Sequence, residues 1–334
     1  MTLRVISAGP GVTVQDMGRP GRLAQGMPRG GAADRLALHE GAALLGQDPG
    51  LAAIEMAAMG GAFETGAPIR IALTGAPMAA RLDDQQLAWN ASHMMQPGQR
   101  LTVGAATRGA YGYLHVGGGI DTPLRLGARA AHLTWGLGRA LAAGDALPVG
   151  EDAAPGHVGW TLNVADRFSG GTARILAGGQ TALFAPEMLA RFEATTFTRD
   201  LRGNRQGVRL GFDGAPFGID GQLNLLSEVI IPGDIQMTGD GAPYVLLPEC
   251  HATGGYPRIG AVTPDDLPMV AQAGPGATLR FRFVTLEDAI AARRKALTAR
   301  RDLRRALRPL VRDPHDIRDL LGYQLISGAI TGWD

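Results

Sequence analysis

The chain of 334 residues contains a single cysteine, Cys250, and a single lysine, Lys295. One cysteine excludes an intramolecular disulfide and a Cys-x-x-Cys metal site. No Gly-Lys-Ser/Thr sequence is present, so the chain has no P-loop for nucleotide phosphates. A Schiff-base lysine or a biotin-carrying lysine would have to be Lys295, which lies in the basic run "RRKALTARRDLRR". These scarcities remove several classes of catalytic chemistry from this chain.

Other features are also missing. No stretch approaches 18 uninterrupted apolar residues, so we expect no membrane span. The first residues, "MTLRVISAGPGVTVQD", lack the apolar run of a signal peptide, and we expect a cytoplasmic protein. The net charge of +1 provides no general attraction to nucleic acid. The seven histidines show neither HxH nor HExxH spacing, so we expect no metal site.

What the chain has in abundance is glycine, with 49 residues spread without a fixed period. Pro-Gly and Ala-Gly turns precede many short apolar stretches, a pattern typical of antiparallel strands. The expected strands include 69–73, 100–103, 111–116, 173–176, 244–247 and 279–284. Helices are expected only at 34–45, 186–192, 263–272 and 286–311. Asp34 and Thr263 are the expected N-caps of the first and third of these helices, and Gly46 is the expected end of the first.

Short strands without a βαβ alternation predict a mainly β protein built from barrels or sandwiches. The Ala-, Pro- and Gly-rich segment 151–160 is the expected boundary between two such units. We therefore predict a first barrel over 1–160, a second over 161–284 and a helical tail over 285–334.

The stretch "TVQDMGRPG" places Asp16 and Arg19 three residues apart around a glycine turn. These two side chains either pair with each other to stabilise the turn or jointly hold a ligand. In "HVGGGID", the backbone N–H groups of Gly117 and Gly118 are candidates to bind an oxyanion or phosphate. The alternative for these glycines is a bulge or a barrel corner.

The stretch "RGNRQGVRLG" carries Arg205 and Arg209, whose guanidinium groups suit carboxylates and phosphates unless they are solvated surface residues. In "ECHATGGYPRIGAV", the glycines at 254 and 255 allow close approach of a ligand, and Tyr256 and Arg258 add polar groups beside them. A dyad of Cys250 with its neighbour in sequence is not expected, since adjacent strand residues point to opposite faces.

Four stretches, in order, resemble the biotin-dependent carboxyltransferase / allophanate hydrolase subunit 2 family: "GPGVTVQDMGRPG", "VGGGID", "RGNRQGVRL" and "ATGGYPRIGAVTPDDLPMVAQAGPGATLRFR". The family includes the C-type chain of ATP-dependent 5-oxoprolinase, the Kip-type antagonist of a sporulation kinase inhibitor, and part of the carboxyltransferase region of urea carboxylase. The resemblance covers about residues 3–290. The family's usual "SDRMGYRL" is here "GNRQGVRL", and its "DRQTTGGYP" is here "ECHATGGYP". These departures leave the choice of substrate within the family open.

The resemblance implies two cyclophilin-like β-barrels, a companion subunit of the B (Kip inhibitor-like) type and, for 5-oxoprolinase, an A-type subunit. It implies that ATP is used through the complex, that biotin, if involved, is carried by a partner, and that neither is bound covalently to this chain. The leading hypothesis is the C-type subunit of a 5-oxoprolinase, which opens the cyclic amide 5-oxoproline to glutamate. The alternatives are carboxyl transfer to urea or a similar amide, and a regulator that pairs with a kinase-inhibitor-like partner.

Within this hypothesis we expect Asp16, Arg19 and Tyr256 to be catalytic. The expected substrate-binding residues are glycines and polar side chains from three of the motifs: Gly117, Gly118, Arg205, Arg209, Thr253, Gly254, Gly255, Pro257 and Arg258. The basic run 293–312 is expected to serve structure or a contact between subunits rather than nucleic acid.

Overall fold

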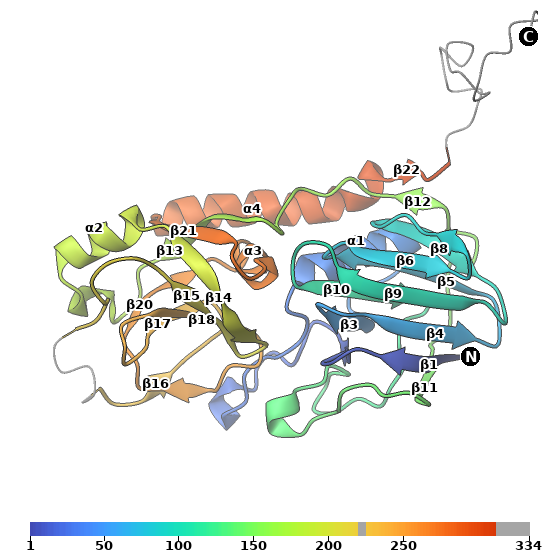
Figure 1. The fold of residues 1–334 in the computed structure, drawn as a ribbon, viewed down its shortest axis with the longest axis horizontal. Coiled ribbons are helices and arrows are strands. Elements are labelled where there is room, and N and C mark those ends of the chain that lie inside the picture. The colour runs from blue at the N-terminus through green and yellow to red at the C-terminus, as the bar shows by residue number, and fades with distance from the viewer. Residues whose placement is uncertain (220–224, 312–334) are drawn as a thin grey trace, which may run out of the picture.

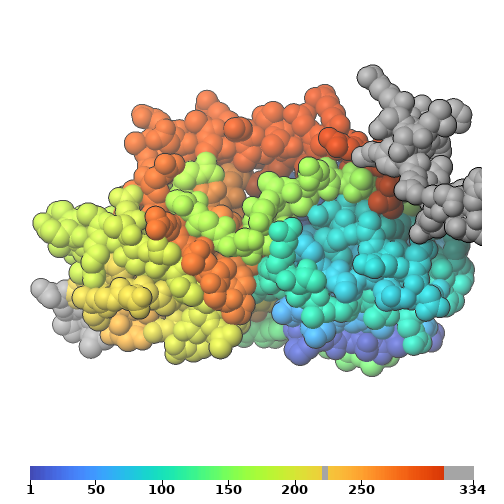
Figure 2. All heavy atoms as spheres, turned by 45° about the horizontal axis from the view of Figure 1, so that its top comes forward, coloured from blue at the N-terminus to red at the C-terminus, as the bar shows by residue number. Residues whose placement is uncertain are grey.

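The computed structural model describes residues 1–219 and 225–311 of the chain. Two β units lie side by side, and the long helix α4 passes over both of them (Figures 1 and 2). The mainly β fold and the helix near the C-terminus that the sequence predicts are confirmed. Among the described residues, no helix is both long and apolar enough to cross a membrane.

The first β unit consists of two sheets that enclose a common apolar core. The six-stranded sheet has the order β11-β1-β4-β9-β6-β7, with β1 (Thr2–Ala8), β4 (Gly61–Thr65), β6 (Met78–Leu82), β7 (Gln85–Gln86), β9 (Arg100–Ala106) and β11 (Ala146–Pro148). The seven-stranded sheet has the order β2-β3-β10-β5-β8-β12-β22, with β2 (Thr13–Gln15), β3 (Ala53–Ala57), β5 (Ile69–Gly75), β8 (Ala91–Met95), β10 (Tyr111–Val116), β12 (Trp160–Thr161) and β22 (Arg308–Pro309).

Strand burial follows from this arrangement. Strand β1 alternates between buried and exposed residues, because one face of its sheet meets the core and the other meets solvent. Strand β10 is buried along its whole length, because helix α1 (Arg35–Leu45) covers the outer face of its sheet. Leu114 therefore points into the core of the first unit, whereas Tyr113 points toward the second unit.

Helix α1 has the start and stop that its sequence predicts. The Asp34 carboxylate caps the first turn by accepting hydrogen bonds from two backbone N–H groups, and Gly46 ends the helix with φ +64°. Gly41, inside the helix, lies against the ring of His115, and a Cβ at this glycine would stand 2.3 Å from that ring. Burial lowers the pKa of His115 to about 3, so the imidazole packs against the helix in its neutral form.

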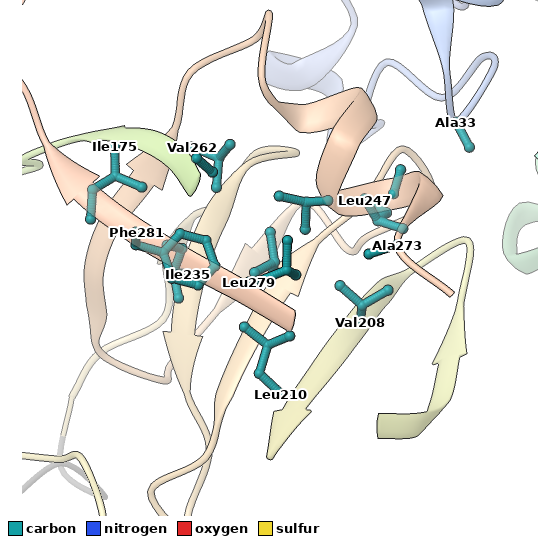
Figure 3. Close-up of a cluster of buried hydrophobic side chains, with 14 of the residues drawn as sticks. Ala33, Ile175, Val208, Leu210, Ile235, Leu247, Val262, Ala273, Leu279 and Phe281 are labelled. Atoms are coloured by element: carbon teal, nitrogen blue, oxygen red, sulfur yellow. The ribbon is translucent and has the colours of Figure 1, made fainter. Parts of the chain in front are cut away.

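The second β unit is a closed barrel with the strand order β13-β20-β17-β18-β15-β14-β21. Its strands are β13 (Gly170–Leu176), β14 (Phe197–Asn204), β15 (Gly207–Gly211), β17 (Asp234–Met237), β18 (Pro243–Leu246), β20 (Arg258–Val262) and β21 (Thr278–Phe283). Within the described part of the barrel, β13 and β21 are the one pair of neighbouring strands that run parallel. The barrel core, part of which is shown in Figure 3, is continuous with apolar residues of the first unit such as Ala33 and Ala53.

Smaller elements complete the second unit. Strands β16 (Glu228–Val229) and β19 (Thr253–Gly254) form a separate two-stranded sheet. Helix α2 (Pro186–Ala194) brings Phe192 into the barrel core, where its ring lies 5.0 Å from that of Phe197. Helix α3 (Leu267–Gln272) begins four residues later than predicted. The predicted cap, Thr263, accepts turn hydrogen bonds through its carbonyl instead, and Asp266 takes the cap position.

Helix α4 (Leu286–Asp302) is shorter than the predicted 286–311, because the chain tightens into the 3-10 helix η5 (Leu303–Ala306) and then extends into β22. Pro309 disfavours a helical conformation at the residue before it, which agrees with this change. Arg293 and Arg300 donate to Asp265 of the second unit at 2.6 and 2.5 Å, and Arg304 donates to the carbonyl of Gln47 in the first unit. These contacts connect α4 with the second unit and η5 with the first unit, so the two helices together link the two units.

Three further 3-10 turns lie in connections: η1 (Leu23–Gln25), η2 (Leu133–Trp135) and η3 (Thr181–Leu183). Strand β12 spans the predicted boundary at residue 160, and β22 of the predicted tail joins a sheet of the first unit. The division of the chain into three segments stays a prediction.

Candidate functional site

A cavity of about 450 Å³ lies between the two β units, within the size range of roughly 300–1,000 Å³ typical of small-molecule sites. We call it the inter-unit cavity. The first unit contributes an apolar wall and a tyrosine, and the β14–β15 hairpin of the second unit contributes most of the polar groups. Its lining residues are Gly11, Ala57, Ala58, Ala110, Tyr111, Leu133, Thr134, Arg199, Gly203, Asn204, Arg205, Gln206 and Glu249.

Arg205 connects the two units at one side of this cavity. Its Nε donates to Glu249 at 2.7 Å, its Nη1 pairs with Glu55 of β3, and its Nη2 donates to the carbonyl of Gly31 at 2.7 Å. Burial by itself lowers the pKa of Arg205, but the two carboxylates outweigh burial and raise it above the usual range. Arg205 is therefore a fully paired buried cation, and the sequence-based expectation that it lies at a site is consistent with its place in the cavity lining.

The carboxylate of Glu55 is also fully used. Its second oxygen accepts from the hydroxyl of Tyr113 at 2.7 Å and from the backbone N–H of Ala33 at 2.8 Å. The same tyrosine hydroxyl accepts from the backbone N–H of Asp34. Burial, and next the neighbouring Glu55, raise the pKa of Tyr113 well above its usual range. This network fixes the inter-unit face rather than offering groups to a ligand.

Two residues that the sequence motifs do not single out face the cavity. Arg199 is 7% exposed, donates from Nη1 to the carbonyl of Asp200 at 2.9 Å, and has a buried Nε without a partner. Tyr111 lies near it, and burial followed by the charge of Glu55 raises the pKa of Tyr111 to about 12. A phenol with this pKa keeps its proton at neutral pH and remains a hydrogen-bond donor.

His132 is a further residue that the sequence motifs do not single out. Its side chain is fully buried, and neither ring nitrogen has a hydrogen-bond partner among the described residues. Burial lowers its pKa, and the nearby Glu249 opposes that shift. The neighbouring Leu133 donates its backbone N–H to Glu249 at 3.2 Å and lines the inter-unit cavity. Because His132 belongs to no recognisable spacing motif, the sequence could not predict that it is buried beside the cavity.

Of the two alternatives for Asp16 and Arg19, a direct ion pair between the side chains is not formed in the described structure. Asp16 accepts from the backbone N–H groups of Gly18 at 2.8 Å and Arg129 at 2.6 Å. Arg19 is 2% exposed and donates to backbone carbonyls of the segment 125–130. Both side chains hold this segment against the 16–19 turn, and neither lines the inter-unit cavity. Their expected catalytic roles stay predictions.

Gly117 and Gly118 form a corner of the first unit. The N–H of Gly117 donates to the carbonyl of Arg70 at 2.8 Å, and the N–H of Gly118 donates to the side chain of Gln47 at 3.1 Å. Gly118 has φ +84°, and a Cβ there would lie 2.3 Å from the carbonyl oxygen of Gly150. The two N–H groups are thus used within the protein, in agreement with the alternative of a barrel corner, and their substrate-binding role stays a prediction.

The other predicted substrate-binding residues lie away from the inter-unit cavity. Arg209 pairs with Asp240 and lies 3.6 Å from Asp200. Arg258 pairs with Glu228, and lies 3.3 Å from Asp234. The structure therefore does not bring these two arginines together with Arg205.

The stretch from Thr253 to Arg258 begins with strand β19 and includes Tyr256, which is 44% exposed. Its other predicted site residues are Gly254, Gly255 and Pro257. Neither the inter-unit cavity nor the two other cavities described in the structure is lined by any of these residues. The expectation that this turn lines a pocket is not met in the described cavities, and the catalytic role of Tyr256 stays a prediction.

Cys250 is buried, and burial raises the pKa of its thiol to about 12, whereas His251 is exposed. The two side chains therefore do not form a reactive dyad. Among residues 1–219 and 225–311, no group of three or more His, Cys, Asp or Glu side chains is arranged to hold a metal ion.

Two β units that share an interface, with a cavity of polar and apolar walls between them, define a two-subdomain β protein, and comparison with known proteins identifies the class. The family model described as "Carboxyltransferase domain, subdomain A and B" matches residues 25–283. The chain belongs to this carboxyltransferase-domain family, as the motifs in its sequence predict.

Two relatives are named as the C-type subunit of 5-oxoprolinase. The Escherichia coli (strain K12) protein is 34% identical over 298 residues, which cover 87% of this chain and 94% of that protein. The Haemophilus influenzae protein is 31% identical over 288 residues, which cover 85% and 91%, respectively. A third relative, urea amidolyase of Lachancea kluyveri, is 28% identical over 309 residues, but only 16% of its length is matched.

Two solved structures have a similar fold. The protein TTHA0988 superposes with a TM-score of 0.76 at 29% identity, covering 84% of this chain and 55% of that chain. The K. lactis urea amidolyase superposes with a TM-score of 0.80 at 24% identity, covering 94% of this chain, and it shares the fold. This chain therefore spans about half of the first protein and 21% of the second.

Proposed function

We propose that this chain is the C-type subunit of an ATP-dependent 5-oxoprolinase, which hydrolyses 5-oxoproline to glutamate together with partner subunits. The observation that carries the proposal is the near full-length match to two proteins named as this subunit of 5-oxoprolinase. The inter-unit cavity supports it, because the cavity has the size and the polarity that a small acidic amide requires.

The reaction adds water to the carbonyl carbon of the lactam, breaks its C–N bond and leaves the proton on the nitrogen, which becomes the amine of glutamate. Negative charge develops on the carbonyl oxygen as water adds. In our proposal the phenol of Tyr111 donates a hydrogen bond to this oxygen, because its pKa of about 12 keeps it protonated at neutral pH. The ion pairs of Arg205 hold the hairpin that forms the cavity against the first unit.

We assign the use of ATP to the partner subunits, since this chain has no P-loop and a single lysine, Lys295. The proposed partners are a companion of the B (Kip inhibitor-like) type and an A-type subunit. A cytoplasmic location also stays a prediction. The chain alone is therefore expected to be inactive on 5-oxoproline.

The test is to co-purify the chain with the proposed companion subunits and to measure glutamate release and ATP hydrolysis with 5-oxoproline. In the assembled complex, ATP hydrolysis is expected to accompany glutamate release. Each subunit alone is expected to show neither activity. Turnover by this chain alone would contradict the division of labour. An assembled set without 5-oxoproline-dependent ATP hydrolysis would contradict the proposed function.

A second candidate, transfer of a carboxyl group from carboxybiotin to urea or a similar amide, is favoured by the match to urea amidolyase. This reaction needs a biotin-carrying partner. Avidin distinguishes the two candidates, because it blocks a biotin-dependent carboxylase and leaves a 5-oxoprolinase unaffected. Carboxylation of urea that avidin abolishes would replace the leading proposal.

A further inference from the structure

The inter-unit cavity contains a buried cation without a counter-ion. Among the described residues, Arg205 has two carboxylate partners, whereas Arg199 has none within 4.0 Å. The only hydrogen bond from the guanidinium of Arg199 within the described part of the chain goes to the carbonyl of Asp200. Its Nε is buried without a partner, and the whole residue is only 7% exposed.

A buried and unpaired guanidinium is unfavourable, because taking an ion out of water costs several kcal/mol unless another charge compensates it. The lowered pKa of Arg199, caused first by burial, has the direction expected for such a group. A ligand carboxylate that accepts hydrogen bonds from the guanidinium would supply the missing charge, since arginine binds carboxylates through paired N–H donors.

The backbone around Arg199 is built to present this side chain. The pairing of β14 with β15 is in register at Arg199, shifts before Gly203, and resumes there, so the strand carries an irregularity between these residues. Such irregularities re-aim side chains near functional sites. Gly203 leaves room for the guanidinium, because a Cβ at this position would stand 2.6 Å from Nη2 of Arg199.

The remaining cavity walls suit a small ring. Ala57, Ala58 and Ala110 from the first unit form an apolar wall, and Tyr111 places a polar group beside it. Tyr111 and Arg199 both line this cavity. In a compact ligand with a carboxylate and an amide, the carboxylate can bind Arg199 and the amide can bind the hydroxyl of Tyr111.

We propose that Arg199 is the specificity-determining residue of this site and binds the carboxylate of a small cyclic amide acid. The identity of that acid as 5-oxoproline rests on the proposed function. The carboxylate preference also excludes urea as the matched ligand, since urea has no charge to pair with Arg199. An unpaired Arg199 in the cavity therefore favours 5-oxoproline hydrolysis over carboxyl transfer to urea.

The experiment compares Arg199→Met with a matched control, Arg202→Met, in the assembled enzyme. Arg202 lies on the same strand, β14, but pairs with Asp200 and lines none of the described cavities. The Arg199 variant is expected to raise KM for 5-oxoproline by about 10- to 100-fold, as for the loss of a charge-assisted hydrogen bond. The control is expected to change KM by less than about twofold. Circular dichroism and thermal melting check that both variants fold.

The neutral analogue 2-pyrrolidinone, which has the lactam ring without the carboxylate, provides the second comparison. Calorimetric competition is expected to show that the wild-type enzyme prefers 5-oxoproline over this lactam and that Arg199→Met removes the preference. Gly203→Ala is expected to act in the same direction, because its methyl group displaces the guanidinium rather than removing it. This second variant keeps the test valid if the first one folds poorly.

Four outcomes decide between the inference and the proposed function. If the wild-type set hydrolyses 5-oxoproline and Arg199→Met loses the acid preference, both stand. If the set is active and Arg199→Met retains the preference, the inference is wrong and the function stands. If the set is inactive on 5-oxoproline, the chain is titrated with a panel of small carboxylic acids and their amides. Acid binding that depends on Arg199 then supports the inference alone, and its absence overturns it.

Discussion

Two regions of the second β unit carry arginines beside glycines, but the arginines differ in their surroundings in the folded protein. On the β14–β15 hairpin, Arg199 and Arg205 lie at the inter-unit cavity and are almost completely buried. Near the outer two-stranded sheet, Arg258 pairs with carboxylates at the surface, and Tyr256 beside it is 44% exposed. Both regions combine arginine with glycine, but among the described residues only the first one faces an apolar wall of the other unit.

The comparison shows that the interface between the units, rather than local glycine content, makes a cavity here. Glycines in the outer region, such as Gly254, allow close packing with Ile230 and Gln236 of the same unit. At the hairpin, Gly203 instead leaves space in front of a guanidinium. The function of a glycine therefore depends on what lies opposite to it.

The largest expected difference between the two regions concerns the loss of an arginine. Arg205→Met leaves Glu55 and Glu249 buried without their cation, and we expect the free energy of unfolding to fall by roughly 3–5 kcal/mol. Arg258→Met removes a pair with the exposed Glu228 and a 3.3 Å contact with the buried Asp234, which keeps a hydrogen bond from the backbone N–H of Ile231, and we expect a smaller loss of about 1–2 kcal/mol. Urea denaturation of both variants provides the measurement. Equal losses would mean that the inter-unit ion pairs do not have the energetic role described above.

A smaller effect is expected at Gln272 of helix α3, which joins the two units through hydrogen bonds alone. Its side chain is fully buried, accepts from the backbone N–H groups of Ala110 and Tyr111, and donates to Asp34 and to the carbonyl of Tyr111. Gln272→Met leaves these groups unpaired, and we expect a loss of about 2–3 kcal/mol.

The measurement for Gln272→Met is the denaturation curve followed by two probes, near-ultraviolet circular dichroism and tryptophan fluorescence. Loss of this joint is expected to separate the transitions of the two units. A matched control is Gln206→Met, whose partly exposed side chain lies at the cavity mouth and makes one hydrogen bond, to Thr134. If the control destabilises the protein as much as Gln272→Met does, the hydrogen bonds of Gln272 between the units do not contribute more to the free energy of unfolding than an ordinary hydrogen bond.

The sequence predicts correctly those strands and helices whose bounds depend on nearby residues, such as caps, glycine stops and runs of β-favouring side chains. Strand β10 has the predicted bounds, 111–116, because apolar and β-favouring residues fill it. Helix α1 has the predicted cap at Asp34 and stop at Gly46 for similar local reasons. The end of α4 could not be predicted in this way, since β22 forms only because β12 offers a partner strand far away in the sequence.

The site was predictable only in part. Arg205 belongs to a recognisable motif and lines the cavity, whereas Arg199 precedes an aspartate and gives no sign of being unpaired. In the strand, the side chains of Arg199 and Asp200 point to opposite faces, and Asp200 pairs with Arg202 instead. Whether a charge has a counter-ion depends on three-dimensional neighbours, which neither spacing nor composition contains.

Cys250 provides a third and smaller test, since its thiol is buried in the outer region of the second unit. We expect Cys250→Ser to change the activity of the assembled enzyme by no more than a few fold. A loss above about 100-fold would mean that the thiol takes part in the reaction.

The same thiol contributes to the pH dependence of stability. Its pKa of about 12 in the folded chain lies above the usual 9, so between these pH values the unfolded chain releases the proton while the folded chain keeps it. The free energy of unfolding therefore falls as the pH rises from 9 to 12, and Cys250→Ala is expected to reduce this slope. Denaturation of both forms at several pH values in this range measures the difference, and identical slopes would contradict the burial of the thiol.

The smallest expected effect concerns Tyr256, for which sequence and structure point to different results. The motif predicts a catalytic tyrosine, so that Tyr256→Ala lowers the activity of the assembled enzyme without unfolding the chain. The structure places its ring at the surface, outside the described cavities, and we therefore expect a change of less than about 0.5 kcal/mol in stability and a KM for 5-oxoproline within about twofold of wild type. Steady-state kinetics beside Tyr111→Phe, which removes the cavity hydroxyl, makes the comparison direct. If Tyr256→Ala lowers kcat more than Tyr111→Phe does, the catalytic groups lie at the outer region, and the inter-unit cavity is not the site of the reaction.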